Sequence, residues 1–465
     1  MKRYIDLFED VWKLNRVHAS EEMEEAYLKV MDYYTNSEIL IYPSGETFGG
    51  GNSWVVPDKW IVKKGLLKNL KGDVIVDFNE NPLRLFTYSP SFTGEISLKE
   101  LKEDHLFSIP SKPKAIPFHF RNQYRPWNRQ WGFCLKHEEL EGLKDDKYIV
   151  EIETEFDKDK MLQLEYTKNG DSKDRFLFIG HFDHPAMCND GLSGCIAANE
   201  VIKRLQGTKT HYTYSSLNSV EIIGSVAYCQ YQKDRLPNTK GAMFIAMSAS
   251  KTPFSYQYSS KPTTYILDRA FNLLLKMRYP NPVFMNFREL VGNDEVAFEA
   301  PGINIPCSSI TRWPYNYYHT SDDNFERVDE ECMEEKISLV LDAIYILENN
   351  YLVKPLFEGL PCLSNPDLNL YLSPTMMSHT KIEVNWETSI KEFMHSKDIE
   401  FIQNEQGHLN DFMNGLVPLL GNNEKEGISI LTIAEKFNLP FKFVHLYLNR
   451  WVKKGLLELG KLTLD

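Results

Sequence analysis

The sequence lacks any apolar run of the roughly 20 residues that a membrane-spanning helix requires. Its first segment, MKRYIDLFEDVWKLNRV, carries Asp6, Glu9 and Asp10 where a secretory signal peptide needs an uninterrupted apolar stretch. Cysteine is scarce: the chain has seven, an odd and widely scattered set that does not resemble a disulfide framework. These absences predict a cytoplasmic protein that does not bind a membrane.

An excess of positive charge is absent as well. The 52 Lys and Arg residues are outnumbered by 65 Asp and Glu residues, which gives a formal net charge of −13. Such a chain has no general attraction for nucleic acid or anionic lipid, because both are negatively charged. Core-forming residues are plentiful at 42% hydrophobic, and a length of 465 residues suggests two or three domains.

Changes in composition along the chain predict the domain boundaries. Residues 46–129 contain short strand-like runs separated by Asn, Pro and Gly, which is typical of a small β-rich domain. This domain is expected to be inserted into a catalytic domain made of residues 1–45 and 130–355. A Pro- and Asn-rich linker follows at 356–379, and residues 380–465 form the last domain.

From residue 174 onward, apolar strands alternate with amphipathic helices. The predicted strands are RFLFI, SVEII (219–223), AMFIAMS (242–248) and INIPCSSIT, and the predicted helices are 191–206, 225–232, 263–277 and 329–350. This alternation predicts an α/β fold with a mainly parallel, mixed sheet flanked by helices. The two runs before it, YIVEIETEF and MLQLEYT, are expected to pair as a hairpin. In such folds the functional residues lie in loops after the carboxyl ends of the strands.

The last domain shows a helix-turn-helix pattern. Helices at 431–437 and 441–454, joined by a Leu-Pro turn and followed by a Gly-containing hairpin start, predict a winged helix. Residues 380–465 hold ten Lys and Arg against twelve Asp and Glu, whereas DNA-binding surfaces are usually basic. We therefore expect this domain to shape the active-site entrance or to form a homo-oligomer, and nucleic acid is not an expected partner.

The run GHFDHPAMCNDGLSG (180–194) crowds metal-binding groups between a strand and a helix. His181 is placed at the end of the strand and Asp190 at the start of the helix, where two ligands of a hydrolytic zinc site could meet. Asp183 is placed to accept a hydrogen bond from an imidazole N–H. His184 could be a ligand, a substrate contact or a packing residue.

Three further motifs supply candidate site residues. YYHTSDDNFERVD places His319 in a polar loop before a helix, and NSVEIIGS places Glu221 within a predicted apolar strand. A carboxylate there is costly to bury unless it is paired or bound to a cation. The third motif, GNDEVAF, offers Asp294, which could line the site or cap a helix.

Taken together in this order, the motifs resemble the zinc-dependent aminopeptidases of the bacterial leucyl-aminopeptidase superfamily. The chain is more closely similar to an aminopeptidase-like family of obscure function that carries an inserted β module and a C-terminal winged helix. Some members of that family are encoded near polysaccharide-biosynthesis genes. The residues that carry the likeness are WVVPDKW, DVIVDF, WGFCL, HFDHPAMCNDGLSG, EIIGSVAY, GNDEVAFEAPGINIPCSS and YHTSDD.

The resemblance implies a zinc exopeptidase-like core and assigns roles to the site residues. By that likeness His181, Asp190 and His319 hold zinc, and Glu221, assisted by Asp183, has the catalytic role of a base. The β module of residues 46–129 would lie over the active-site face. Candidates for substrate contacts are Asp294, Arg312, Tyr318 and His184.

Two departures from the two-zinc enzymes predict a single ion. Those enzymes carry adjacent glutamates where this chain has only Glu221, preceded by Ser219 and Val220, and an aspartate where this chain reads MSASKTP. Whether Glu221 is the base or a ligand stays open, and manganese or iron could replace zinc at two imidazoles and one carboxylate. The leading prediction is a metal-dependent aminopeptidase or related amide hydrolase. The alternatives are a degenerate binding or regulatory protein and a hydrolase of amino-sugar amides.

Overall fold

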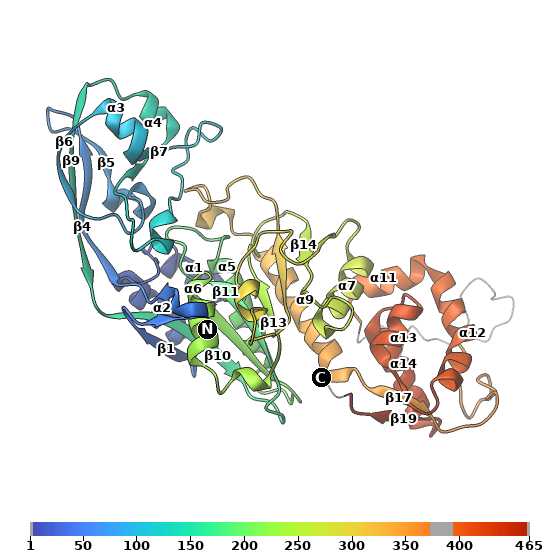
Figure 1. Ribbon diagram of the computed structural model, residues 1–465. Coiled ribbons are helices and arrows are strands. Elements are labelled where there is room, and N and C mark those ends of the chain that lie inside the picture. The colour runs from blue at the N-terminus through green and yellow to red at the C-terminus, as the bar shows by residue number, and fades with distance from the viewer. Residues whose placement is uncertain (1–2, 373–393, 463–465) are drawn as a thin grey trace. The chain divides into compact units, whose positions relative to one another are not determined.

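A computed structural model describes residues 3–372 and 394–462 (Figure 1). The chain divides into two compact units: residues 1–260 with 284–338, and residues 261–283 with 339–465. The end of the predicted linker, from residue 373, and the first and last residues of the predicted C-terminal domain lie outside the described residues. The predicted domain boundaries stay a prediction.

The first unit is built on an eight-stranded mixed sheet with the order β1-β10-β12-β11-β13-β16-β14-β15. Its strands are β1 (Glu38–Pro43), β10 (Lys160–Lys168), β11 (Arg175–His181), β12 (Thr213–Ser219), β13 (Thr239–Ile245), β14 (Phe254–Gln257), β15 (Val283–Met285) and β16 (Cys307–Arg312). The four central strands β12, β11, β13 and β16 are parallel, whereas β1, β10 and β14 run antiparallel to their neighbours. The predicted mainly parallel, mixed sheet is confirmed.

Helices cover this sheet. They are α1 (Tyr4–Val11), α2 (Glu21–Tyr33), α5 (Leu192–Leu205), α6 (Ile223–Tyr231) and α8 (Glu295–Phe298). Helix α5 is almost entirely buried and packs against strands β10 to β13. Its close approach depends on Gly194, because a Cβ atom there would lie 2.0 Å from the carbonyl oxygen of Ile245. The helix after β11 is thus pressed onto the sheet, which fixes the loop between them.

A second, four-stranded sheet with the order β5-β4-β9-β6 belongs to the same unit. Its strands are β4 (Lys59–Lys68), β5 (Val74–Asp77), β6 (Phe92–Ser97) and β9 (Lys147–Asp157), and the unit also contains the short strands β2 (Thr47–Phe48), β3 (Trp54–Val55), β7 (Leu106–Phe107) and β8 (Phe133–Cys134). Trp60, Tyr88 and Tyr148 lie in its buried core. Because β9 pairs with β4 and β6, this sheet extends past residue 129, where the inserted domain was expected to end.

The predicted hairpin between YIVEIETEF and MLQLEYT is wrong. The first run is β9, in the four-stranded sheet, and the second is β10, in the eight-stranded sheet. Their burial differs accordingly: β9 alternates between buried and more exposed residues, whereas β10 is buried along most of its length. Each strand therefore finds its partners in a different sheet, and adjacency in the sequence misleads.

The second unit consists of helices and a small sheet. Its elements are α7 (Ile266–Arg278), most of α9 (Glu330–Asn349), α11 (Ser396–Asn404), α12 (Gln406–Asn422), α13 (Ile430–Lys436) and α14 (Phe441–Lys453), with the strands β17 (Leu352–Pro355), β18 (Ile428–Ser429) and β19 (Leu457–Gly460). Helices α13 and α14 confirm the predicted helix pair. The winged-helix assignment itself stays a prediction. None of the helices in the described ranges combines the length and apolar character needed to cross a membrane.

Candidate metal and active site

The candidate site lies where two neighbouring parallel strands end. Strand β11 ends at His181 and β12 ends at Ser219, and these two residues are partners in the ladder. Glu221 follows two residues later, before Ile222 turns the chain into α6 with a φ of 58°. The predicted strand over 219–223 is therefore wrong, because Glu221 lies just beyond the strand. This position still brings its carboxylate to the edge of the sheet where His181 emerges.

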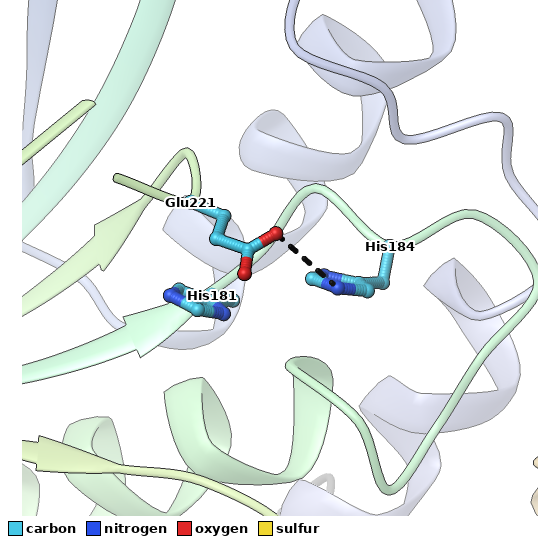
Figure 2. Close-up of side chains that lie close together, drawn as sticks. All are labelled: His181, His184 and Glu221. Carbon is cyan, nitrogen blue, oxygen red and sulfur yellow. Dashed lines mark ion pairs between the residues drawn. The ribbon is translucent and has the colours of Figure 1, made fainter. Parts of the chain in front are cut away.

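His184 occupies the centre of the site. Its Nε2 lies 3.8 Å from Oδ2 of Asp190 and 3.9 Å from Oε2 of Glu221, and its ring lies nearly parallel to that of His181 at a centroid distance of 5.6 Å. Figure 2 shows the imidazole of His184 and the carboxylate of Glu221 turned toward one another. The sequence alone leaves the role of His184 open, whereas in the structure both groups of potential ligands contain it.

Two groups of potential metal ligands result among the described residues: His181 with His184 and Glu221, and His184 with Asp190 and His319. Within each group the ligand atoms lie within 4.8 Å of one another. The predicted trio of His181, Asp190 and His319 does not form such a group by itself. These residues converge through His184, whose ring centroid also lies 5.6 Å from that of His319.

His319 and Asp190 form the tightest part of the second group. Nε2 of His319 lies 2.9 Å from Oδ2 of Asp190, and the carbonyl oxygen of His319 accepts a hydrogen bond from the N–H of Phe118. Asp190 lies at the start of α5, as expected, and directly precedes Gly191, which is the N-cap of that helix. Gly191 has a φ of 87°, a conformation that favours glycine.

Asp323 positions Asp190 and was missed by sequence reasoning. Its two carboxylate oxygens accept hydrogen bonds from the backbone N–H groups of Asn189 and Asp190, at 2.7 and 2.8 Å. Burial and the neighbouring charge of Asp190 raise the pKa of Asp323 to about 7. The signal was present in the motif YHTSDD, where Asp323 stands four residues after His319.

The imidazole that pairs with Asp183 belongs to His18, which is not one of the candidate metal ligands. Nε2 of His18 lies 3.1 Å from Oδ2 of Asp183, and Oδ1 accepts the backbone N–H of Glu221 at 2.9 Å. Burial raises the pKa of Asp183, but the hydrogen bond from His18 and the nearby imidazoles lower it more, to well below its usual range. Asp183 thereby connects the N-terminal segment to the loop that carries Glu221.

His181 is engaged by Asp294. Its Nε2 contacts Oδ2 of Asp294 closely, while Oδ1 of Asp294 accepts the backbone N–H of Ile222 at 3.2 Å. Burial lowers the pKa of His181. The surrounding carboxylates, of which Asp294 has the largest effect, raise this pKa by more, so that it reaches about 10. Asp294 was expected as a substrate contact, and the structure places it as the partner of a candidate ligand.

The other two expected substrate contacts differ in outcome. The ring of Tyr318 stacks on His319 at a centroid distance of 3.8 Å, so it borders the site. Arg312 is held elsewhere: its guanidinium donates to the carbonyl oxygen of Thr252, pairs with Glu335 and lies over the ring of Phe254. The structure therefore does not bring Arg312 into the cluster.

Two residues far away in the sequence complete the site. The hydroxyl of Tyr124 donates a hydrogen bond of 2.6 Å to Oε2 of Glu221. Arg16 is fully buried, and its guanidinium donates to the carbonyl oxygens of Val11, Phe182, His184 and Met187. Arg16 thus holds the loop after β11 in place. No sequence motif marked either residue, because both act through contacts that only the fold creates.

The donor set fits a divalent metal ion. Imidazole nitrogens and carboxylate oxygens are the ligands that zinc takes at hydrolytic sites. Oδ2 of Asp190 is buried and accepts no hydrogen bond within the described part of the chain, despite its closeness to His319. A buried carboxylate oxygen without a donor is costly, and a cation would satisfy it. The number of ions stays a prediction.

Comparison with known proteins supports this interpretation of the fold. Over 299 residues the chain is 31% identical to a Clostridium acetobutylicum protein whose name gives it a role in polysaccharide biosynthesis and an aminopeptidase-like domain. That match covers 64% of this chain and 67% of the relative.

Solved structures are similar over most of their length. The crystal structure of a Clostridium acetobutylicum protein whose name assigns it to the peptidases has a TM-score of 0.77 and 24% identity, and the match covers 98% of this chain and 96% of that one. A zinc aminopeptidase from Bacillus subtilis has a TM-score of 0.54 and 12% identity, with 74% and 94% covered. The fold is thus that of the zinc exopeptidases.

The family is shown by the sequence itself. A domain of unknown function named DUF4910 matches residues 5–350, which is well over half of the chain and includes every residue of the candidate site. The protein therefore belongs to the DUF4910 family and has a peptidase-like fold.

Proposed function

We propose that the protein is a metal-dependent amide hydrolase of the aminopeptidase type. The observation that carries this proposal is the position of His184, within 4 Å of both Asp190 and Glu221. His181 and His319 flank it at the edge of a parallel sheet. Parallel α/β sheets place their reactive groups at this edge, and the similarity to zinc aminopeptidases supports the same use here.

In this proposal His184, Asp190 and His319 hold the ion, and His181, which is paired with Asp294, lies beside them as a third imidazole. A divalent cation supplies Lewis-acid polarisation of an amide carbonyl and lowers the pKa of water. Asp323 fixes Asp190 through the backbone of the loop, and Arg16 fixes the carbonyl oxygen of His184. These residues keep the donor atoms in place before a substrate arrives.

Glu221 is assigned the role of general base. Its side chain is 19% exposed, whereas those of His184 and Asp190 are 3% and 4% exposed, so a substrate and a water molecule can reach Glu221. Glu221 takes the proton of the attacking water and returns it to the leaving amine. Tyr124 holds one carboxylate oxygen, and Asp183 holds the backbone N–H of Glu221.

The proposal is tested by metal analysis and kinetics on protein purified without a metal-affinity tag. We expect bound zinc, turnover of aminoacyl p-nitroanilides or dipeptides, and loss of turnover on chelation. Glu221→Gln should lower kcat by roughly 100-fold or more while bound metal is retained, because general-base catalysis contributes about that much. The matched control is Glu326→Gln at an exposed position. Stoichiometric zinc with no turnover of any peptide or acyl-amide would overturn the proposal.

A second candidate function is hydrolysis of the amide of an amino sugar. It is favoured by the Clostridium acetobutylicum relative whose name refers to polysaccharide biosynthesis. Release of acetate from N-acetylated amino sugars, without cleavage of dipeptides, would favour it over the peptidase.

A third candidate is a binding protein that retains the fold but not the reaction. The basis is two missing carboxylates: the chain has only Glu221, preceded by Ser219 and Val220, where two-zinc enzymes carry adjacent glutamates, and it reads MSASKTP where they carry an aspartate. Binding of a ligand or of DNA without any turnover would favour this candidate. If the protein does not bind DNA even at low salt, a DNA-binding role is excluded.

A further inference from the structure

We propose that the substrate of the candidate site carries a carboxylate group and that the positive charge of residues 112–129, the basic segment, attracts it. This inference rests on the proposed function, because the carboxylate would belong to the amide substrate. Two sources of such a group are considered: an acidic peptide and an acidic sugar.

The sequence around the basic segment lacks acidic residues. No Asp or Glu occurs between Asp104 and Glu138, although the chain has 65 of them in 465 residues. The basic segment contains five cationic residues: Lys112, Lys114, Arg121, Arg125 and Arg129. A chain with a net charge of −13 therefore carries a local excess of positive charge in this segment.

Several contacts hold the basic segment against the candidate site. The N–H of Phe118 donates to the carbonyl oxygen of His319 at 2.9 Å. The rings of Phe118 and Phe120 lie 5.4 and 5.3 Å from that of His319, centroid to centroid. Further along, Tyr124 donates its hydroxyl hydrogen bond to Glu221. The segment thus forms a wall of the site, beside a candidate ligand and the proposed base.

Three of the cationic residues lie close to these contacts. Nζ of Lys112 lies 3.4 Å from the carbonyl oxygen of Tyr318, whose ring stacks on a candidate ligand. Arg121 and Arg125 are both exposed, and each directly follows an aromatic residue that contacts the site. Because electrostatic interactions extend over about 8 Å at physiological ionic strength, these charges make the potential at the site more positive.

The charges of the basic segment are not neutralised by neighbouring acids. Within the described ranges, none of its five cationic residues has a carboxylate oxygen within 4.0 Å. Burial lowers the pKa of Lys112 by more than the charge of Asp322 raises it. A partly buried ammonium group without a counter-ion is stabilised by an anionic ligand. Lys158, in contrast, lies 2.7 Å from Oδ1 of Asp58 and adds nothing to the excess.

The carboxylates of the site itself do not cancel this excess. The side chains of Asp183 and Asp294 are fully buried and that of Asp190 is 4% exposed, and each lies beside an imidazole. Glu221 is 19% exposed and accepts a hydrogen bond. In the proposed function a divalent ion adds further positive charge. An anionic substrate is therefore favoured over a cationic one.

The substrate has room beside the basic segment. A cavity of about 590 Å³, within the usual range for small-molecule sites, is lined by Tyr124 and Arg129 of this segment. Ile223 lines it as well, and its N–H donates to the carbonyl oxygen of Glu221 at 2.6 Å. A substrate that extends from Glu221 into the cavity would lie along the basic segment.

Calorimetric titration of the full chain with zinc tests the inference. The Glu221→Gln variant serves as the background, so that the probes are not hydrolysed. Each of two probe pairs differs by one carboxylate. The first pair is L-alanyl-L-glutamic acid α-amide and L-alanyl-L-glutaminamide, and the second is the methyl glycosides of N-acetylglucosaminuronic acid and N-acetylglucosamine.

The anionic member of at least one pair should bind roughly tenfold more tightly than its neutral partner, as expected for a charge-assisted interaction. This preference should shrink as sodium chloride rises from about 50 mM to about 500 mM, because salt screens exposed charges. A preference within the first pair identifies a peptide as the source, and one within the second pair identifies a sugar.

Variants in the same background locate the binding. The double variant Arg121→Gln/Arg125→Gln removes two exposed charges and should abolish most of the preference while leaving affinity for the neutral probe unchanged. The control is Lys71→Gln/Lys144→Gln, which removes the same charge from two exposed lysines. Both lie at the end of the four-stranded sheet that is remote from the cavity, so the preference should persist.

Three results would contradict the inference: no preference for the anionic member of either pair, a preference that salt does not weaken, or equal losses in the double variant and its control. Failure of the proposed function looks different. Charge-dependent binding without hydrolysis of any amide by the wild type removes the function and keeps the assignment of the basic segment. Hydrolysis of anionic and neutral probes with equal kcat/KM does the reverse.

Discussion

Tyr124 and Glu221 are 97 positions apart in the sequence, yet the phenol hydroxyl of one donates a 2.6 Å hydrogen bond to the carboxylate of the other. Burial and the charge of Glu221 raise the pKa of Tyr124 well above its usual range, so the phenol stays protonated and remains a donor. The segment that carries Tyr124 is thereby tied to the group proposed to move the proton.

Removing this hydroxyl should slow the reaction without unfolding the protein. Tyr124→Phe keeps the ring and deletes one hydrogen bond to a charged group, which is worth about 1.5–3 kcal/mol. We expect kcat to fall by roughly tenfold to 100-fold. The thermal midpoint should fall by no more than a few degrees. Steady-state kinetics measure the effect, and Tyr371→Phe at an exposed position is the control. An unchanged kcat would show that Glu221 does not depend on Tyr124.

His184 should be more important for metal binding than its ambiguous position in the sequence suggests. His184→Ala removes the member common to both ligand groups, and we expect zinc affinity to fall by more than the roughly 10- to 100-fold typical of residues that only orient ligands. Metal content by mass spectrometry and zinc titration measure this. His137→Ala, which removes a histidine bonded to Ser108 instead, should retain full metal content.

Removal of the metal should destabilise the fold. Oδ2 of Asp190 is left without a donor when no cation is present, and a ligand at about 100 times its Kd stabilises by about 2.7 kcal/mol. We therefore expect a chelator to lower the thermal midpoint of the wild type by several degrees, and excess zinc to restore it. The His184→Ala variant should show no such response, and a response equal to that of the wild type would place the ion elsewhere.

Arg16 should be essential for stability although it is remote from the motifs. Arg16→Met leaves the carbonyl oxygens of Phe182, His184 and Met187 without their donor in a buried setting, which should lower the free energy of unfolding by about 3 kcal/mol or more. Urea unfolding measures this change. Arg121→Met removes an exposed arginine and should change stability by less than about 0.5 kcal/mol.

The second unit should lose stability in acid through His445. Burial, with a smaller contribution from Lys442, lowers the pKa of His445 to about 4, and its Nδ1 lies 2.7 Å from the hydroxyl of Tyr345. The unfolded chain takes up this proton near pH 6.5 and the folded chain only near pH 4, so stability is lost as the pH falls between these values.

The change that tests this is His445→Gln. The wild type should lose about 3 kcal/mol more than the variant between pH 7 and pH 4 in denaturant unfolding. His408→Gln, at a partly exposed position in the same unit, should lose stability in parallel with the wild type. A variant that follows the wild-type pH curve would mean that His445 is not a source of the acid sensitivity.

The central strands could be predicted because β11 and β13 are continuous apolar runs, as buried parallel strands usually are. Strand β12 was misplaced for the opposite reason. Its sequence, TYSSLNS, is polar, yet six of its seven residues are buried. The free-energy cost of burying these polar side chains is offset by side-chain hydrogen bonds, such as those from Asn218 and Ser216 to Asn199 on α5. A polar strand of this kind resembles a loop until its partners are known.

The candidate site was predictable where one segment carries several ligands. HFDHP, NDGLSG and YHTSDD each hold groups of the type that bind metals, and the structure brings them together. His18 and Tyr124 could not be found in this way, because each lies in an unremarkable segment and reaches its partner across about a hundred or more positions. The central place of His184 depends on the turn after β11, where Ala186 adopts a φ of 50°.

The passage of the chain from β9 to β10 has a practical consequence for protein engineering. Only Lys158 and Asp159 separate the last residue of one sheet from the first residue of the other. A transplant of the module from a relative would therefore need to carry residues 46–157 as one cassette. A graft that stops at residue 129 would bring β4 and β6 from the relative but leave β9 to the recipient. Because β9 lies between β4 and β6, the recipient's strand would then have to pair with a foreign strand on each side.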